Sequence, residues 1–400
     1  MTYEGGVAQW RYMLISVIMP VKNNEKIFPH AVSCILNQQY TDWELIIMEG
    51  CSSDRTRELA DSYAESDERI RVFHVDEWIY ESINIGIYHA KGEYITFLNS
   101  DDKLAEDALA IAADYIDRYG VDLFLFPVGV YRVDSQQNII EDCTPPIFNV
   151  LDKELVLQDA KSVRDYWEDL FFFSGLLQNQ LNVYKKKVVE GIRFRNDYVN
   201  ADQLYNLEVM PKVNSLAYYP KVLYQFLEYQ KTDNMNASVG KFYEYHFDMC
   251  NELYYRTLNL FASYNLDSDR VKHLLREKRI TSIISELETY KFENCDISFT
   301  EKILKIMQHV NYWKDIFIIE NIFEELENKV IAVCYELYML SRLEEEQISS
   351  EIYEIIVGII EIFSISSKGP QGVDIKKIYG LVKAYNNPAH IGIGILNELL

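Results

Sequence analysis

The sequence predicts an α/β domain, built on a mainly parallel sheet flanked by helices, followed by an all-α C-terminal extension. Over residues 13–128, short runs rich in β-branched and aromatic residues alternate with helix-like segments, which is typical of parallel strands joined by helical crossovers. After residue 232 the chain changes to long stretches with helical periodicity that contain almost no proline or glycine. A length of 400 residues exceeds one typical domain, which agrees with two units.

Short apolar runs in the first half predict strands at 14–19, 44–48, 70–75, 94–98 and 121–127. Helical periodicity predicts helices at 27–39, 82–90 and 104–119, and the run Ser52-Ser53-Asp54 offers capping oxygens for another helix that runs toward Ala64. We expect Pro20 to end the first strand, because proline has no N–H group to donate to a ladder. We expect Gly120 to close the helix over 104–119.

The domain boundaries follow from changes in this pattern. Residues 131–230 mix strand-like pieces with turns, whereas helical periodicity covers 242–262, 267–290, 328–343 and 348–363, with a break at 366–370. We therefore divide the chain into a domain of residues 1–232, with halves at about 13–128 and 129–232, and a helical domain of residues 233–400.

The composition argues against several classes of function. The formal net charge is −23 and the pI is near 4.8, so the surface repels nucleic acid, and we expect no nucleic-acid partner. The six cysteines form no CxxC pattern and the seven histidines no HExxH pattern, which argues against disulfides and zinc. No apolar run reaches the about 18 residues of a spanning helix, and the start lacks a signal peptide. We expect a cytoplasmic chain without a transmembrane segment, with peripheral contact at the inner face of the cell membrane left open.

The run from Gly92 to Asp102 carries the clearest chemistry. A buried strand at 94–98 leads directly into Asn99-Ser100-Asp101-Asp102, a cluster of short oxygen-bearing side chains. In open α/β sheets, ligands bind beyond the carboxyl ends of the strands. Carboxylate and amide oxygens there suit Mg²⁺ or Mn²⁺, which in turn binds a diphosphate. The alternative is that these residues only cap a helix that starts near Leu104.

Four short pieces follow successive strands in the same way, at 16–23, 44–56, 79–95 and 97–102. In this order and spacing they resemble the family 2 glycosyltransferases of the GT-A fold, a Rossmann-like arrangement. The resemblance spans roughly residues 13–128 and a later element at 200–205. It implies an inverting enzyme that moves a sugar from a nucleotide-diphosphate donor, expected to be a UDP-sugar, to the hydroxyl of a carbohydrate or lipid-linked glycan. Assembly of bacterial surface polysaccharide or glycoconjugates is the expected setting.

The resemblance assigns nucleotide contacts to the first two strand ends. The backbone around Pro20, Val21 and Lys22 is expected to face the base and the ribose. Glu49 stands where the family usually has aspartate, and it is expected to accept a hydrogen bond from a uracil-type N–H or a ribose hydroxyl. Gly50 stands where the family often has a second acid. The alternative for Glu49 is a solvated loop carboxylate.

The resemblance places Asn99-Ser100-Asp101 on the family's Asp-x-Asp metal motif. Asp101 is expected to bind the divalent ion directly. Asn99, which replaces the first acid, is expected to ligate through its amide oxygen or to contact the ribose or a metal-bound water, and Ser100 to contact the nucleotide. Asp102 is expected to lie behind the ligand and orient its neighbours.

Asn84 and Lys91 lie in the segment where family members contact the sugar diphosphate, and surface solvation is the alternative for both. The family often has arginine just before Asn84, where this chain has Ile83. Trp78 and Tyr80 are the aromatic residues expected nearest to a sugar.

The later element assigns the catalytic base. Asp202 is expected to deprotonate the acceptor hydroxyl, because a sugar hydroxyl becomes a good nucleophile only as its proton leaves. Capping of a helix over 203–209 is the alternative for Asp202, and Asp197 is the competing base. The polar run 178–180 is expected beside the acceptor.

Two rival functions stay open at this point. A nucleotidyltransferase would need a glycine-rich loop with arginine after the first strand, which residues 20–24 lack. A non-catalytic sugar- or nucleotide-binding scaffold of the same fold would explain the departures at Asn99 and Gly50. For the helical domain we expect one of three roles: a wall of the acceptor cleft, a homo-oligomer interface, or docking on a membrane-associated assembly.

Overall fold

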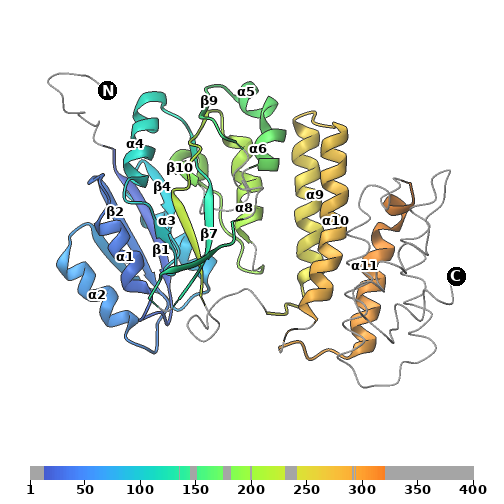
Figure 1. Cartoon of the computed structure of the whole chain (residues 1–400), viewed down its shortest axis with the longest axis horizontal. Coiled ribbons are helices and arrows are strands. Elements are labelled where there is room, and N and C mark those ends of the chain that lie inside the picture. Colours follow the sequence, from blue (N-terminus) through green and yellow to red (C-terminus); the bar gives the residue numbers. More distant parts are fainter. Residues whose placement is uncertain are drawn as a thin grey trace. The chain divides into compact units, whose positions relative to one another are not determined.

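The computed structural model describes residues 13–134, 136–144, 151–173, 182–198, 201–229, 241–290, 292 and 294–319. The chain divides into two compact units, residues 1–237 and residues 238–400 (Figure 1). The sequence places the boundary at residue 232, which lies within a segment outside the described residues. The predicted helices 328–343 and 348–363, the break at 366–370 and the run 178–180 also lie outside them.

The first unit has the predicted α/β fold, with an eight-stranded sheet in the order β3-β2-β1-β4-β10-β6-β11-β9 (Figure 1). Strands β3, β2, β1 and β4 are parallel neighbours, and β10 joins β4 in antiparallel register. Its strands are β1 (Ile15–Val21), β2 (Trp43–Glu49), β3 (Ile70–His74), β4 (Tyr94–Phe97), β6 (Leu123–Leu125), β9 (Leu155–Leu157), β10 (Asn182–Lys185) and β11 (Leu216–Tyr218).

A smaller sheet has the order β5-β12-β7-β8, with β5 (Lys103–Leu104), β7 (Val128–Val133), β8 (Ile139–Asp142) and β12 (Tyr224–Glu228). The helices of the first unit are α1 (Phe28–Leu36), α2 (Thr56–Ser66), α3 (Ile79–His89), α4 (Ala108–Tyr119), α5 (Ala160–Asp165), α6 (Trp167–Phe173), α7 (Lys186–Val189) and α8 (Ala201–Val209), with a 3-10 turn η3 at Met210–Lys212. Gly120 ends α4 with a φ of 61°, as predicted.

Two boundaries differ from the sequence prediction for reasons of strand pairing. Strand β1 continues through Pro20 to Val21, because the N–H that proline lacks would point toward β4, whose pairing with β1 ends at Ile18. Leu104, predicted as the start of a helix, lies in β5 and pairs with Tyr224 of β12. A partner so distant in the sequence leaves no local signal.

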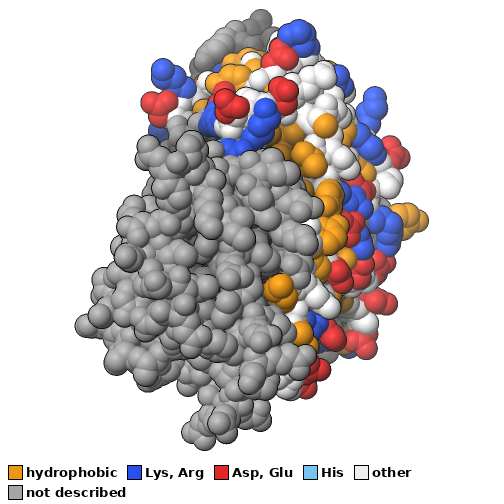
Figure 2. Space-filling model, turned by 90° about the vertical axis from the view of Figure 1, so that its right-hand side faces the viewer, with side chains coloured by type: hydrophobic (Ala, Val, Ile, Leu, Met, Phe, Trp, Pro, Cys, Tyr) orange, Lys and Arg blue, Asp and Glu red, His pale blue; other side chains and the backbone are white. Residues whose placement is uncertain are grey.

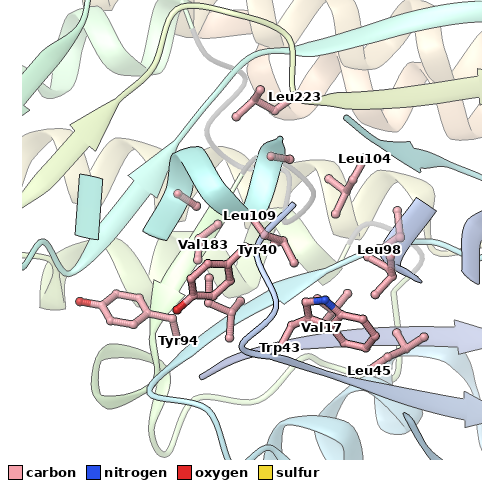
Figure 3. Close-up of a cluster of buried hydrophobic side chains, with 14 of the residues drawn as sticks. Val17, Tyr40, Trp43, Leu45, Tyr94, Leu98, Leu104, Leu109, Val183 and Leu223 are labelled. Carbon is pink, nitrogen blue, oxygen red and sulfur yellow. The ribbon is translucent and has the colours of Figure 1, made fainter. Parts of the chain in front are cut away.

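A continuous hydrophobic core forms between the large sheet and the helices that cover it (Figure 3). Val17 and Leu45 on adjacent parallel strands are fully buried, and Trp43 is 1% exposed. The hydroxyl groups of Tyr40 and Tyr94, which lie at its margin, donate to the carbonyls of Met13 and Val121 at 2.6 and 2.8 Å. Burial of each such large side chain contributes about 1.5–3 kcal/mol, so this core holds the strands in register.

The second unit contains α9 (His246–Ser263), α10 (Asp269–Thr289) and α11 (Phe299–Ile319). Figure 1 shows α9 and α10 side by side. The first two helices agree with the predicted stretches, whereas α11 was not predicted. Its start carries a capping box, because Ser298 and Glu301 bond each other's backbone N–H groups at 2.9 and 3.3 Å. That Ser-x-x-Glu spacing was the available sequence signal.

None of the helices in the described part of the chain has the length and hydrophobicity of a membrane-spanning segment. On the face that Figure 2 shows, acidic, basic and hydrophobic side chains of the described residues are interspersed. The net charge of −23 is therefore not gathered into one acidic field on this part of the surface.

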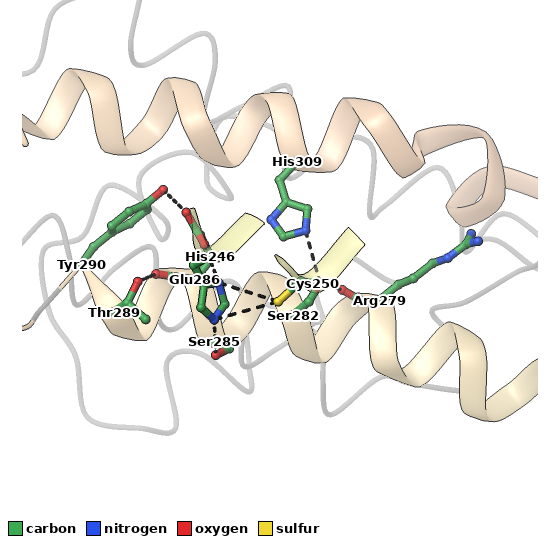
Figure 4. A network of polar contacts seen from close by, with 9 residues as sticks. All are labelled: His246, Cys250, Arg279, Ser282, Ser285, Glu286, Thr289, Tyr290 and His309. Atoms are coloured by element: carbon green, nitrogen blue, oxygen red, sulfur yellow. Dashed lines mark hydrogen bonds and ion pairs between the residues drawn. The ribbon is translucent and has the colours of Figure 1, made fainter. Parts of the chain in front are cut away.

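A buried polar network joins α9, α10 and α11 in the described part of the second unit (Figure 4). The ring of His246 bonds Glu286 Oε2 at 2.7 Å and Ser285 Oγ at 3.1 Å, and the hydroxyl of Tyr290 donates to the other Glu286 oxygen at 2.6 Å. Burial alone would lower the pKa of His246, but the contacts with Cys250 and Glu286 outweigh burial and raise it to about 10. His246 is therefore an imidazolium paired with a carboxylate.

We predict that this ion pair makes the stability of the helical unit fall in alkaline solution. Because the pKa of His246 is about 10 when folded and about 6.5 when unfolded, its contribution is complete below pH 6.5 and is lost as pH rises toward 10. Thermal unfolding of the full chain should show this loss, and His246→Gln should reduce it. The exposed His30 supplies the control His30→Gln, and equal pH slopes for His246→Gln and the wild type would contradict the account.

Candidate functional site

The parallel strands end at one edge of the large sheet, and most of the predicted binding residues follow these ends. Pro20 and Val21 are the last residues of β1, Glu49 is the last residue of β2, and Asn99–Asp102 follow β4. Ligands of open α/β sheets bind at this edge. The structure therefore brings these predicted residues to one region of the fold.

Asp102 is a buried carboxylate, 1% exposed, that ties the end of β4 to the smaller sheet. Its Oδ2 accepts hydrogen bonds from the Tyr224 hydroxyl at 2.6 Å and from Asn99 Nδ2 at 2.9 Å, and its Oδ1 accepts from the Leu227 N–H at 2.9 Å. Burial and, after it, the charge of Asp101 raise the pKa of Asp102 well above its ordinary value. Asp102 thus fixes the turn that presents Asp101.

The alternative that Ser100-Asp101-Asp102 caps a helix near Leu104 is wrong. Helix α4 begins at Ala108 after an N-cap at Asp107, and β5 lies between the turn and that helix. The three residues are instead part of a turn that is held from two sides.

The turn is also held from the β1 side, by Asn24. Asn24 Nδ2 donates to the carbonyl of Ser100 at 3.1 Å and to Ser100 Oγ at 3.2 Å, while the Asn24 N–H donates to Thr56 Oγ1 at 2.8 Å. Asn24 therefore connects the segments after β1, β2 and β4, through its side chain to Ser100 and through its backbone N–H to Thr56. Ser100 is almost fully buried by this contact, at 9% exposed.

Asp101 and Asn99 are the residues that would hold a divalent cation. Both oxygens of Asp102 already accept hydrogen bonds, so Asp101 is the carboxylate that the turn offers, and Asn99 offers its amide oxygen because its Nδ2 donates to Asp102. Within the described residues there is no group of three or more His, Cys, Asp or Glu side chains suited to a metal. This set fits Mg²⁺ or Mn²⁺ held by one or two protein oxygens with substrate phosphates completing the shell, and it does not fit an all-protein cage.

Glu49 is fully buried at the end of β2. Its Oε1 accepts from the Ser52 N–H at 2.6 Å, and its Oε2 bonds His74 Nδ1 at 2.8 Å, while His74 Nε2 bonds Asp61 at 3.0 Å. Burial raises the pKa of Glu49, but the bonds from Ser52 and His74 outweigh burial and lower it overall. The alternative of a solvated carboxylate is wrong. The predicted nucleotide contact stays a prediction, and it requires that Ser52 or His74 release its bond.

Lys22 lies on the loop after β1 and is half exposed, with its Nζ 3.8 Å from Asp76. Its aliphatic stem packs over Gly50, where a Cβ atom would lie 3.1 Å from two carbons of Lys22. The Glu49-Gly50 pair therefore has a packing reason: the missing side chain at Gly50 lets Lys22 lie close to the end of β2. The contacts predicted for Pro20, Val21 and Lys22 with a nucleotide stay predictions.

Asn84 is buried on α3, at 4% exposed. Its Nδ2 donates to the Phe194 carbonyl at 2.9 Å and to Glu81 Oε2 at 3.1 Å, and its Oδ1 accepts from the Phe194 N–H at 2.8 Å. The structure thus uses the amide of Asn84 inside the protein, where sequence reasoning expected a contact with the sugar diphosphate. The alternative of surface solvation is wrong for this residue.

The prediction that Lys91 contacts the sugar diphosphate is wrong. Lys91 precedes the start of β4, and its N–H donates to Glu44 Oε1 near the start of β2. The neighbouring Gly92 N–H donates to Ser16 Oγ near the start of β1. Lys91 therefore lies at the amino ends of the parallel strands, whereas Asp101 lies at their carboxyl ends. Its exposed side chain fits the alternative of solvation.

Asp202 lies in the first turn of α8 and is half-buried. Burial raises its pKa to about 7, although backbone N–H groups of Gln203 and Asp202 partly oppose this effect. The charge of Asp202 also acts on the buried hydroxyl of Tyr184, whose strand β10 neighbours β4. A carboxyl group with a pKa near neutrality is suited to take a proton at physiological pH.

Asp197, the competing base, has the opposite environment. It is exposed and pairs with Arg195, whose hydrogen bond is the main cause that lowers the pKa of Asp197. A carboxylate with a lowered pKa is a weaker base, so the electrostatics favour Asp202 over Asp197.

The two aromatic residues singled out by the sequence differ in exposure. Tyr80 is 8% exposed and stacks on Phe194 with ring centroids 5.7 Å apart, so it is part of the core. Trp78 is 39% exposed and meets the edge of Tyr80 at 5.4 Å. Of the two, only Trp78 has a ring exposed enough to contact a sugar, and this contact stays a prediction.

Sequence reasoning missed Asn24 and Tyr224. The polar pair Asn23-Asn24 directly after a buried strand was an available signal for the first. Tyr224 had no local signal, because its role depends on a hydrogen bond to Asp102, 122 positions away.

The comparisons with known proteins agree with this architecture. Residues 16–175 match the family described as Glycosyl transferase family 2. Glycosyltransferase GlyG of Streptococcus pneumoniae is 30% identical over 186 residues, which are 46% of this chain and 60% of GlyG. The poly(ribitol-phosphate) beta-N-acetylglucosaminyltransferase TarP of Staphylococcus aureus is 26% identical over 302 residues, which are 72% of this chain and 85% of TarP.

A solved structure shows the same fold. The crystal structure of S. aureus TarS residues 1–349 in complex with UDP-GlcNAc aligns with a TM-score of 0.52 and 16% identity, over 89% of this chain and 91% of that one. The chain spans about half the length of curated relatives such as GlyG, of which it covers 60%, and the putative teichuronic acid biosynthesis glycosyltransferase TuaG of Bacillus subtilis, of which it covers 39%.

The order of the strands, the turn at Asn99–Asp102 and these matches lead to one conclusion. Residues 16–175 are similar to glycosyl transferase family 2, and the first unit has the GT-A fold.

Proposed function

We propose that the protein transfers a sugar from a UDP-linked donor to a hydroxyl group of a glycan acceptor, with inversion at the anomeric carbon. The observation that carries the proposal is the turn at Asn99–Asp102, which follows β4 at the carboxyl edge of the parallel sheet, within the residues that match glycosyl transferase family 2. Asp202, a half-buried carboxyl group whose pKa is raised to about 7, is the proposed base. Surface glycan synthesis in bacteria is supported as the setting by the names of relatives such as TarP and TuaG. We propose a cytoplasmic location for the reaction, with contact at the inner face of the cell membrane left open.

The donor side of the proposed reaction lies at the carboxyl edge of the parallel sheet. The loop of Pro20, Val21 and Lys22 would lie against the base and ribose, and Lys22 carries a positive charge toward this edge. Asp101 and Asn99 would hold Mg²⁺ or Mn²⁺, which when bound neutralises the charge that develops on the departing diphosphate.

The acceptor side is assigned to Asp202. Its carboxylate takes the proton of the acceptor hydroxyl while that oxygen attacks the anomeric carbon, and the diphosphate leaves from the opposite face. One displacement of this kind inverts the configuration at carbon. Since half of Asp202 is ionised near pH 7, the base is available at neutral pH without a second titrating group.

Asp202→Asn should stop transfer and leave the donor site intact. The amide cannot accept the proton, so kcat with UDP-GlcNAc as the first donor tested should fall by about 100-fold or more. Affinity for UDP, measured by calorimetric titration with Mn²⁺, should not change. Asp197→Asn is the matched control and should retain turnover. Near-normal turnover of Asp202→Asn would remove Asp202 from the mechanism.

The rate of transfer should follow the ionisation of Asp202. Because the base must be deprotonated and its pKa is about 7, kcat should rise about tenfold per pH unit below 7 and level off above it. Stability should change in the opposite direction, since a carboxyl group with a raised pKa destabilises the fold as it ionises. Asp202→Asn should therefore unfold at a higher temperature than the wild type at pH 8. A kcat that does not vary across pH 6–8 would contradict the assignment.

Asp101→Asn should weaken the binding of UDP in the presence of Mn²⁺. Loss of the Asp101 carboxylate should cost about tenfold in affinity, or about 1.4 kcal/mol. The exposed Asp107, at the start of α4, gives the control Asp107→Asn, which should bind as the wild type does. If the wild type binds UDP equally well with Mn²⁺ and with chelator, the metal proposal is wrong. Absence of both UDP binding and UDP-sugar hydrolysis would favour a non-catalytic scaffold.

A further inference from the structure

The amide of Asn84 and the backbone of Phe194 form a reciprocal pair of hydrogen bonds between distant segments. Asn84 Nδ2 donates to the Phe194 carbonyl at 2.9 Å, and the Phe194 N–H donates to Asn84 Oδ1 at 2.8 Å, across 110 positions of sequence. A primary amide presents a donor and an acceptor side by side, which an aspartate or a leucine of similar size does not. Both groups are buried, so breaking the pair would leave polar groups without water.

Asn84 is a rigid anchor because α3 lies unusually close to the sheet. At Gly86, in the same helix, an added Cβ would lie 2.7 Å from Ile18 Cγ2 of β1 and 3.4 Å from Met48 of β2. The helix can approach this closely only because residue 86 lacks a side chain. Asn84 therefore holds the backbone of Phe194 against a helix that packs closely on β1 and β2.

Phe194 in turn contacts both the strand and the helix that carry the proposed chemistry. Its ring stacks on that of Tyr205 of α8, with ring centroids 3.8 Å apart and an interplanar angle of 9°. It also packs nearly perpendicular to the ring of Phe97, with centroids 5.6 Å apart. Phe97 is the last residue of β4, just before Asn99. Tyr205 lies one turn after Asp202 on α8. One ring thus connects the strand that leads into the turn at Asn99–Asp102 with the helix that carries Asp202.

A second link holds the same helix from β10. The hydroxyl of Tyr184 accepts from Asn182 Nδ2 and donates to Asn206 Oδ1, both at 2.6 Å, and Thr96 of β4 donates to the Asn182 carbonyl at 2.9 Å. This link fixes the middle of α8. The Asn84–Phe194 pair fixes the backbone of residue 194, whose ring packs on Tyr205 of the same helix.

We propose that Asn84 is a positioning residue, which acts through Phe194 to set the place of Asp202 relative to the turn at Asn99–Asp102. The inference rests on the proposed role of Asp202 as the base. It differs from a contact between Asn84 and the donor, because it assigns the effect of Asn84 to the rate of the chemical step. A misplacement of about 1 Å at a catalytic group can cost about 100-fold in rate.

The test compares Asn84→Asp with the wild-type full chain. One oxygen of the introduced carboxylate can still accept from the Phe194 N–H. The other oxygen replaces the donor and is repelled by the Phe194 carbonyl and by Glu81, so the two hydrogen bonds between residues 84 and 194 should break. We expect kcat to fall by about 10- to 100-fold and the pH midpoint of kcat to shift, while the KM for UDP-sugar and the affinity for UDP stay unchanged. Hydrogen exchange should become faster in peptides covering 192–209.

Arg193→Gln is the matched control. It removes the ion pair with Glu81, at 2.7 and 2.8 Å, from the same loop, but the arginine side chain is 63% exposed and such pairs contribute little. The control should keep the kcat and the exchange pattern of the wild type.

Each other outcome is decisive. Weakened UDP binding with kcat retained would show that Asn84 contacts the donor and would overturn the proposal. Unchanged hydrogen exchange together with an unchanged kcat would overturn it too.

If Asn84→Asp does not fold, Phe194→Leu decides, because it keeps the backbone bonds and removes the stack on Tyr205. It should lower kcat with UDP affinity intact, and full activity would overturn the proposal. If the wild type transfers no sugar, the proposed function fails, and hydrogen exchange still reports on the Asn84–Phe194 pair.

Discussion

The buried carboxylate of Asp102 is the interaction on which the candidate site depends. It accepts hydrogen bonds from Tyr224, Asn99 and the Leu227 backbone, and it thereby joins the turn after β4 to β12 of the smaller sheet. A buried carboxylate that lacks hydrogen-bond partners costs several kcal/mol. A shift of either sheet that broke these bonds would therefore destabilise the fold. Asn24 holds the same turn from β1. Asp101 is thus presented from a turn that is fixed on both sides.

The acidic residues near this edge have the same functional groups and different environments. Hydrogen bonds from Ser52 and His74 keep Glu49 ionised although it is buried, and pairing with Arg195 does the same for the exposed Asp197. Burial raises the pKa of Asp202 to about 7, and no cationic side chain is among the groups that act on this pKa. Environment, more than residue type, therefore selects which carboxyl group can exchange a proton at neutral pH.

The fold and the general location of the site could be predicted from the sequence, because they depend on local patterns. Alternating apolar runs gave the strands β1 to β4, and polar residues after β4 gave the turn at Asn99–Asp102. The order of the short motifs carried the family resemblance, which the match at residues 16–175 confirms.

The roles of single side chains were less predictable, because they depend on partners far away in the sequence. Asn84 turns inward to Phe194, and Asp102 bonds Tyr224 rather than capping α4. Lys91 was placed near the sugar diphosphate by its motif, but it lies before β4 and so at the wrong edge of the sheet. A sequence motif predicts which strand a residue adjoins. The pairing of the strands is needed to show at which edge of the sheet that residue lies.

We propose that Asp101 and Asp202 lie on opposite sides of one bound UDP-sugar, with Asp101 beside the diphosphate and Asp202 beside the sugar. A crystal structure of the full chain with UDP-GlcNAc and Mn²⁺ tests it most directly. If the proposal holds, density for the ion should lie at Asp101 beside the diphosphate, and the Asp202 carboxylate should be directed at the side of the anomeric carbon away from the phosphate. Density for the nucleotide with Asp202 directed into a separate region, and no space for a hexose between the two acids, would contradict it.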